Sequence, residues 1–327
     1  MEHGGDLHAA KAQFPEAPEP WLDLSTGINP RVYPFTPPPI EAFARLPSPA
    51  EAAALEAVAA QAYGISDPAR VAAVSGSQAL IQILPRLRPQ GRVVVLAPTY
   101  SEHGRCWARA GHAVEEAPDL DAALARDPAV VVAVNPNNPD GRVIPDWRLL
   151  EAGRILAARG GWLVVDEAFA DLEDEASVAP HDAPGIVVMR SLGKAYGLAG
   201  LRLGFAVAAP ELAERIRQES GPWAVSGPAL AIGSQALSDR AWLEVQKRER
   251  KLFAAELDRL LVAVGFRIEG GTRLFRLAAH ADAEGWFQHL ASHGILVRKF
   301  KDNRRLLRFG NLIDETKSRL NGALGNR

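Results

Sequence analysis

The chain has 327 residues, of which 47% are hydrophobic and 23% are charged, a composition typical of a globular protein. Its formal net charge of −2 gives no electrostatic reason to expect a nucleic acid or an anionic membrane as a partner. The single cysteine, Cys106, excludes an internal disulfide and favours a reducing compartment. Because we find no signal-peptide pattern and no apolar run near the roughly 20 residues that span a bilayer, we expect a cytoplasmic protein without a membrane segment.

The first 48 residues are expected to form an N-terminal arm. Ten of the 24 prolines lie in residues 15–49, and the three consecutive prolines at 37–39 cannot lie inside a helix. A disordered tail is one interpretation of this composition. Large apolar residues such as Trp21, Tyr33 and Phe35 instead favour an ordered arm that packs on the rest of the chain.

Residues 49–208 are expected to form a large α/β domain. An alanine-rich helix over 49–64 opens it, and short apolar runs then alternate with amphipathic stretches. Continuous apolar strands separated by helices predict a mostly parallel sheet that is covered on both faces. The expected strands are 71–74, 92–97, 129–134, 162–165, 186–189 and 203–207, and the expected helices between them are 78–87, 101–110 and 146–159.

Residues 209–327 are expected to form a helical connection and a smaller α+β domain. Periodic stretches predict helices over 211–220, 228–238 and 240–264. Four short strands are expected over 266–269, 273–277, 295–298 and 306–309, with helices over 283–293 and from 314 onward.

Lys194 is the strongest candidate for a reactive group. It lies among small residues just after the apolar run 186–189, and Arg202 follows eight positions later. A lysine amine in such a desolvated place loses its proton more readily and becomes a nucleophile. Ser191 and Arg202 add a hydroxyl and a guanidinium that suit an anionic group such as a phosphate.

Three other loops follow predicted strands. Gly76, Ser77 and Gln78 precede a helix and either bind a phosphate through backbone N–H groups or simply cap the helix. Asn138 lies in a turn between two prolines that is either a plain turn or a rigid mount for its amide. Asp166 ends a buried strand, where a carboxylate needs a cation unless it caps a helix.

These four loops together supply what pyridoxal 5′-phosphate (PLP) requires of a protein: a lysine, a carboxylate, an amide and a phosphate site. In their order and spacing they resemble the fold-type I PLP enzymes of the aspartate aminotransferase superfamily, along nearly the whole chain. The resemblance is closest to the histidinol-phosphate aminotransferases and the threonine-phosphate decarboxylases. It implies the fold-type I α/β fold, with a helix-covered parallel sheet and a smaller C-terminal α+β domain.

The resemblance implies a role for each matching residue. Lys194 would bind the cofactor aldehyde covalently, Asp166 would pair with the ring nitrogen, and Tyr100 would lie over the ring; these three are the catalytic candidates. Asn138 would bond the phenolic oxygen. The residues that would hold the cofactor phosphate are Gly76, Ser77, Ser191 and Arg202, with Gln78 as a weaker candidate.

Two segments resemble the threonine-phosphate decarboxylases of cobalamin biosynthesis in particular. They are the opening His-Gly-Gly-Asp at residues 3–6, with the later run Leu-Asp-Leu-Ser-Thr-Gly-Ile-Asn-Pro at 22–30, and the Pro-Trp pair at 222–223. The alternative interpretation is that Trp223 is a core aromatic and that His3 belongs to a disordered terminus. Arg308 matches the arginine that binds the substrate carboxylate, and the remaining substrate candidates are His3, Gly27, Asn138 and Arg298, of which Arg298 would equally suit a surface strand.

Two residues depart from the aminotransferase pattern. Phe169 replaces the usual tyrosine, a change that decarboxylase relatives tolerate. Leu46 replaces a tyrosine that relatives send into the cofactor phosphate site of the neighbouring subunit. The resemblance implies a homodimer, but Leu46 makes this contact across the subunits doubtful.

The expected reaction is the loss of carbon dioxide from L-threonine O-3-phosphate, which gives (R)-1-aminopropan-2-ol O-2-phosphate, without any metal. The substrate is thus a small phosphorylated amino acid. The first alternative is a histidinol-phosphate-type aminotransferase, since cofactor activation serves both reactions. The second is a non-catalytic binding or regulatory module, which would not need Lys194.

Overall fold

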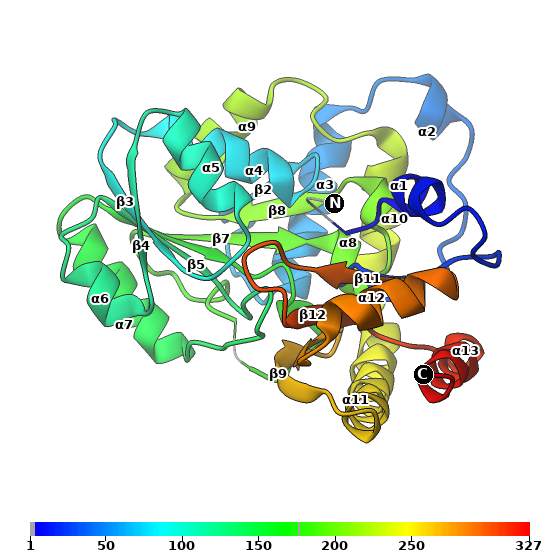
Figure 1. Cartoon of the computed structure of the whole chain (residues 1–327). Coiled ribbons are helices and arrows are strands. Elements are labelled where there is room, and N and C mark those ends of the chain that lie inside the picture. Colours follow the sequence, from blue (N-terminus) through cyan, green and yellow to red (C-terminus); the bar gives the residue numbers. More distant parts are fainter. Residues whose placement is uncertain (1–3, 176) are drawn as a thin grey trace. The chain divides into compact units, whose positions relative to one another are not determined.

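The computed structural model describes residues 4–175 and 177–327 and comprises two compact units (Figure 1). The large unit contains Tyr33–Asn138 and Val143–Leu243. The small unit contains the residues up to Val32, the short segment Pro139–Arg142, and Glu244–Arg327. No helix among these described residues is long and apolar enough to cross a membrane.

The large unit is built on a seven-stranded sheet in the order β2-β8-β7-β6-β5-β3-β4. Neighbouring strands are parallel except at β8, which runs antiparallel to both β2 and β7. The expected, mostly parallel sheet is therefore confirmed. The strands are β2 (Val71–Val74), β3 (Arg92–Leu96), β4 (Ala113–Ala117), β5 (Val130–Val134), β6 (Trp162–Asp166), β7 (Ile186–Ser191) and β8 (Gly204–Val207).

Strand β4 was not expected from the sequence. It is an edge strand, and its Ala-Val-Glu-Glu-Ala sequence leaves only its last residue buried. An edge strand that carries charge lacks the continuous apolar run by which the buried parallel strands were recognised.

Helices cover both faces of this sheet. On one face α4 (Ser77–Ile83), α5 (Glu102–Arg109) and α9 (Pro210–Ser220) pack over a core of valines and leucines (Figure 1). On the opposite face lie α7 (Asp146–Ala157) and α3 (Pro49–Ala62), on which α10 (Gly227–Ser238) packs. The short helices are α2 (Glu41–Ala44), α6 (Leu120–Leu124) and α8 (Leu192–Ala195).

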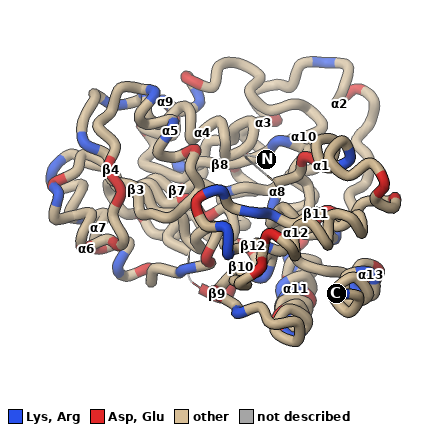
Figure 2. The backbone as a smooth tube through the Cα atoms, in the orientation of Figure 1, with Lys and Arg blue, Asp and Glu red and all other residues tan. Residues whose placement is uncertain are grey.

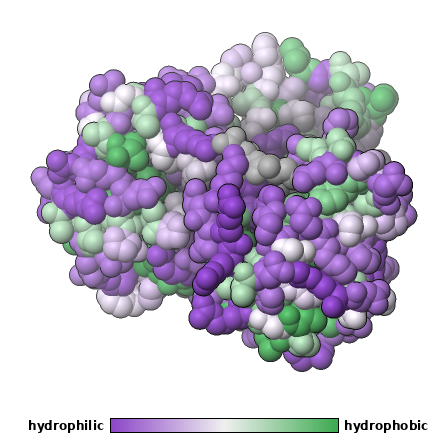
Figure 3. Space-filling model, viewed as in Figure 1, coloured by the Kyte–Doolittle hydropathy of each residue, from purple (hydrophilic) through white to green (hydrophobic). Residues whose placement is uncertain are grey.

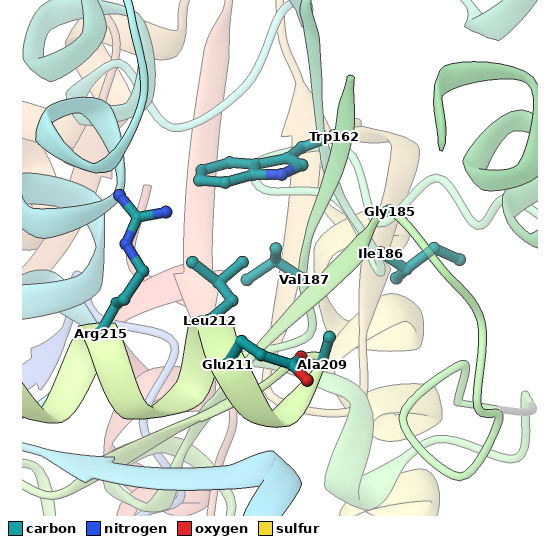
Figure 4. A pocket seen from close by; sticks show the side chains of 8 residues that line it. All are labelled: Trp162, Gly185, Ile186, Val187, Ala209, Glu211, Leu212 and Arg215. Carbon is teal, nitrogen blue, oxygen red and sulfur yellow. The ribbon is translucent and has the colours of Figure 1, made fainter. Parts of the chain in front are cut away.

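A hollow of about 220 Å³ lies at the amino ends of β6 and β7, beside α9. Figure 4 shows the Trp162 ring together with the side chains of Val187 and Leu212 around it, and its lining is mostly apolar. Ligands of open α/β sheets bind beyond the carboxyl ends of the strands. The hollow is therefore at the edge opposite to the loops that carry the candidate residues.

The small unit is built on a five-stranded sheet in the order β1-β11-β12-β10-β9. β1 is parallel to β11, and the other neighbours are antiparallel. Its strands are β1 (Leu22–Leu24), β9 (Arg267–Thr272), β10 (Phe275–Ala279), β11 (Ile295–Lys299) and β12 (Leu306–Gly310), and its helices are α1 (Leu7–Gln13), α11 (Arg240–Ala263, from Glu244 onward), α12 (Ala283–Ser292) and α13 (Asp314–Gly325).

The observed units differ from the expected boundaries of 1–48, 49–208 and 209–327. The beginning of the arm belongs to the small unit because Leu22–Leu24 pair with β11 and Leu24 enters that unit's core. Helices α9 and α10 belong to the large unit because α9 packs on its sheet and α10 packs on α3. The sequence predicted that the arm is ordered, but it did not predict that part of the arm forms a strand that pairs with β11.

Candidate functional site

Lys194 lies on α8, the short helix that starts directly after β7. Its side chain is half-buried, and its Nζ lies 5.6 Å from the centre of the Phe169 ring. Close packing surrounds the loop, since a Cβ at Gly193 would lie only 2.9 Å from the Cα of Ala199. The lysine therefore lies beside an aromatic ring, in a loop that is closely packed at Gly193.

Asp166 is the last residue of β6, is 5% exposed, and lies at the same edge of the sheet as the lysine loop. This follows from the register, because Asp166 pairs with Met189 of β7, two residues before Ser191. One carboxylate oxygen accepts a 3.0 Å bond from the backbone N–H of Ala168. The other oxygen, Oδ2, lies 2.9 Å from Nε2 of His103.

The sequence did not single out His103. It is 1% exposed on α5, and its ring holds Asp166 from the side of that helix. A buried histidine that contacts a carboxylate fixes the orientation of the carboxylate and helps to offset its burial. Its position three residues after Tyr100, in the first turn of α5, was the only available signal, and one histidine at that spacing does not predict a partner.

Tyr100 and Gln78 lie beside this pair. The Tyr100 hydroxyl donates to Oε1 of Gln78 over 3.3 Å, and its ring packs edge-on against His103 with 6.2 Å between the centres. Burial raises the pKa of Tyr100, and the charges of Glu102 and Asp166 raise it further. The phenol is therefore neutral at ordinary pH and presents a flat, uncharged ring beside the carboxylate.

A group of small residues and one guanidinium lies at the carboxyl end of β7. A Cβ at Gly76 would lie 2.7 Å from Nη2 of Arg202, and one at Gly204 would lie 2.5 Å from the backbone nitrogen of Ser77. Ser191 pairs with Gly204 across β7 and β8, so it belongs to the same group. Gly76 has a φ of +79°, which suits glycine alone. Hydroxyl, backbone N–H and guanidinium donors thus gather as a phosphate requires.

The asparagine turn is tied to the segment that carries Tyr100. The Asn137 side chain donates to the carbonyl of Pro98 over 2.9 Å and accepts a 2.6 Å bond from the Thr99 hydroxyl. Asn137 therefore has a structural task. Asn138, which is half-buried, remains the candidate for cofactor contact.

The substrate candidates that the structure describes lie in the small unit, apart from Asn138. Arg308 of β12 is buried and donates over 2.9 Å to the carbonyl of Ser25, and Gly27 follows in the same buried loop after β1. Arg298 of β11 pairs directly with Arg308 across the antiparallel strands. His3 lies outside the described residues.

Burial lowers the pKa of Arg308 to about 10, and the charge of Arg298 adds to this effect, while Asp23 opposes it. Two guanidiniums opposite each other on neighbouring strands repel, and a bound anion relieves that repulsion. Positive charge continues into the turn between β11 and β12, where Figure 2 shows basic residues gathered. The sequence there is Arg298-Lys299-Phe300-Lys301-Asp302-Asn303-Arg304-Arg305.

Trp223, the marker of the decarboxylase branch, is 57% exposed and has a φ of +57°. The alternative that it is a core aromatic is therefore wrong.

The candidate residues thus fall into two sets. Lys194, Asp166, Tyr100 and the residues expected to hold the cofactor phosphate belong to the large unit, and Arg298, Arg308 and Gly27 belong to the small unit.

Comparison with known proteins identifies the family and the fold of this chain. The family model described as "Aminotransferase class I and II" matches residues 40–308. A threonine-phosphate decarboxylase of Pseudomonas aeruginosa is 42% identical and covers 99% of this chain and 97% of its own length. One from a Sinorhizobium species is 41% identical, over 94% and 92%. Among solved structures, the histidinol-phosphate aminotransferase of Sinorhizobium meliloti in complex with pyridoxal-5′-phosphate has a TM-score of 0.79 at 22% identity and covers 98% of this chain and 93% of its own.

Proposed function

We propose that this chain, which belongs to the class I and II aminotransferase family and within it to the threonine-phosphate decarboxylases, releases carbon dioxide from L-threonine O-3-phosphate. The organic product is (R)-1-aminopropan-2-ol O-2-phosphate, which we assign to cobalamin biosynthesis. The observation that carries the proposal is the 42% identity along 99% of the chain to a curated enzyme of that name. We also infer a cytoplasmic enzyme, because the proposed substrate is a small phosphorylated metabolite.

The residues of the large unit fit PLP as the cofactor. Lys194 would bind it covalently, Asp166 would pair with the ring nitrogen, and Asn138 would bond the phenolic oxygen. The cofactor phosphate would take Gly76, Ser77, Ser191 and Arg202, with Gln78 nearby. The fit is supported by the Arg202 guanidinium against Gly76, in the space where any other side chain would put a Cβ. When bound, PLP withdraws electrons from the Cα atom of an amino acid, which makes loss of the carboxylate feasible.

The protein's own groups then have defined tasks. His103 and the N–H of Ala168 fix the orientation of the Asp166 carboxyl group, which would pair with the ring nitrogen of the bound cofactor. Tyr100 supplies a flat, neutral surface on which an aromatic ring packs. After carbon dioxide has left, the Nζ of Lys194 is the group that returns a proton to Cα.

The substrate residues decide which bond breaks. A decarboxylase must orient the substrate so that the bond from Cα to the carboxylate breaks, whereas an aminotransferase must orient it so that the bond from Cα to its hydrogen breaks. The proposed groups for this task are Arg308 and, with it, Arg298, Gly27 and His3, with Asn138 as a further contact. Positioning of this kind is worth several orders of magnitude in rate, so small differences here separate the two reactions.

We also propose a homodimer. In the single chain Ile40, Phe43 and Leu46 on and beside α2 are 72%, 63% and 63% exposed, and Figure 3 shows hydrophobic side chains in this region. Three large apolar side chains so close together in the sequence are typical of a buried interface. Leu46, which stands where relatives have a tyrosine, then contributes apolar contact in place of a hydroxyl.

The test uses purified protein loaded with PLP and L-threonine O-3-phosphate, without any keto acid. We expect carbon dioxide release with the wild type and none with Lys194→Ala. If turnover begins only after histidinol phosphate and 2-oxoglutarate are added, the chain is an aminotransferase. If borohydride traps no cofactor on Lys194, the non-catalytic alternative holds.

A further inference from the structure

The segment Pro139–Arg142, which follows the asparagine turn, belongs to the small unit although the residues on both sides of it belong to the large unit. Its backbone lies directly against β9. A Cβ at Gly141 would lie 2.0 Å from the carbonyl oxygen of Gly271, and a Cβ at Gly270 would lie 2.1 Å from the carbonyl oxygen of Asp140. Because real Cβ atoms do not approach other atoms within 3.0 Å, this reciprocal contact needs glycine at both positions.

The backbone conformation gives a second reason for glycine. The φ angle is +73° at Gly141 and +152° at Gly270, values that residues with a side chain rarely adopt. A local hydrogen bond also stabilises the turn within this segment, since the Asp140 side chain accepts a 3.0 Å bond from the backbone N–H of Arg142. β9 is the edge strand of the small unit's sheet, so its outer side is where a further segment can lie.

The other side of the turn is held in the large unit. The Asn135 side chain accepts a 2.7 Å bond from the N–H of Ile144 and donates a 3.1 Å bond to its carbonyl. Asn137 is held by Pro98 and Thr99. Asn138 therefore lies between the anchored Asn137 and the contact that Asp140 and Gly141 make with β9, and its backbone is restricted further because a proline follows it.

We propose that Gly141 and Gly270 are positioning residues that set the orientation of the Asn138 side chain through the contact of their backbones with β9. This inference rests on the proposed role of Asn138 toward the cofactor. A side chain at either position pushes residues 139–142 away from β9, and the displacement passes through one peptide bond to Asn138. The sequence motif predicts the turn, but only the structure shows that the residues after the turn lie against β9.

The test compares Gly141→Ala and Gly270→Ala with Gly160→Ala as the matched control. Gly160 has a φ of +66°, close to the +73° of Gly141, and no atom lies within 4 Å of the place that a Cβ would take there, so alanine adds a similar backbone strain without a collision. We expect both test variants to bind PLP more weakly and to lose on the order of 10²-fold in kcat/KM, as misplaced groups do. The control should keep wild-type values. Equal behaviour of Gly141→Ala and Gly160→Ala overturns the inference.

A double-mutant cycle separates positioning from a general loss of stability. In an Asn138→Ala background, Gly141→Ala should weaken PLP binding no further, because its effect acts through the missing amide. An additive loss of PLP affinity means that Gly141 is merely structural. If wild-type protein binds no PLP, the proposed function fails, whereas the inference alone fails if the wild type is active and the cycle is additive.

A measurement on the unaltered chain serves if the variants do not fold. PLP binding should slow amide hydrogen exchange both in residues 139–142 and in β9, because coupling between two sites is reciprocal. Exchange in β9 that does not respond to PLP contradicts the proposal.

Discussion

At the scale of single residues, the contact between His103 and Asp166 is the feature that the sequence did not reveal. We expect His103→Gln to lower PLP affinity and kcat/KM by about 10- to 100-fold, the range seen when a group that orients a key ligand is lost. His112 gives a matched control, because it is also a buried histidine of the large unit but contacts Pro85 and Gly91. Equal losses in His103→Gln and His112→Gln would show that the effect is only one of stability.

Arg308 makes a second prediction at this scale. Its buried guanidinium is the proposed ligand of an acidic substrate group, so Arg308→Gln should lower kcat/KM for threonine phosphate by about 10²-fold or more. Removal of a buried cation whose pKa is lowered also removes an unfavourable burial, so thermal stability should fall far less than activity. A variant that loses stability and PLP binding in proportion to activity would contradict a substrate role.

At the scale of elements, helix α3 depends on a capping box at its first turn. The Ser48 side chain accepts from the N–H of Glu51, and Glu51 accepts in return from the N–H of Ser48. We expect Ser48→Ala to cost about 1 kcal/mol and to lower the unfolding midpoint of the large unit by about 2–4 °C. Thermal unfolding followed by circular dichroism measures this, and an unchanged midpoint would show that packing alone holds the helix.

Glu51 gives the pH dependence of the same cap. The Arg45 guanidinium, with two bonds from Ser48, lowers the pKa of Glu51 from 4.5 to about 2. Because the pKa is lowered in the folded state, its contribution to stability is present above pH 4.5 and is lost as the pH falls toward about 2. Glu51→Gln should therefore unfold at a lower temperature than wild type at pH 7 and converge with it in strong acid. A difference that is constant with pH contradicts this account.

The elements also show how far the sequence predicts the fold. The central strands β5 and β6 were predictable because buried parallel strands are continuous apolar runs. β4 was not predictable because it is an edge strand that carries two glutamates. β1 was not predictable because it has only three residues and pairs with a strand that begins far along the chain, at Ile295. The candidate site was predictable to a similar extent. The loops that follow the buried strands could be recognised in the sequence, but the contact of Asp166 with His103 could not, because the two residues are 63 positions apart.

At the scale of the whole molecule, the exposed apolar residues around α2 predict self-association. Phe43→Glu places a charge in the proposed interface and should convert a dimer into a monomer, because an unpaired charge is costly to bury. Analytical ultracentrifugation measures the change, with Trp147→Glu as a control at an equally exposed aromatic on α7. A wild type that sediments as a monomer would remove the dimer from the account.

The central claim is the bond that breaks, and carboxyl-labelled L-threonine O-3-phosphate tests it directly. In heavy water, with PLP and no keto acid, nuclear magnetic resonance should show the label leaving as carbon dioxide and bicarbonate. One solvent deuteron should enter the carbon that lost it, in equal amount. Label that stays in a phosphorylated keto acid, formed only after an amino acceptor is added, would contradict the account.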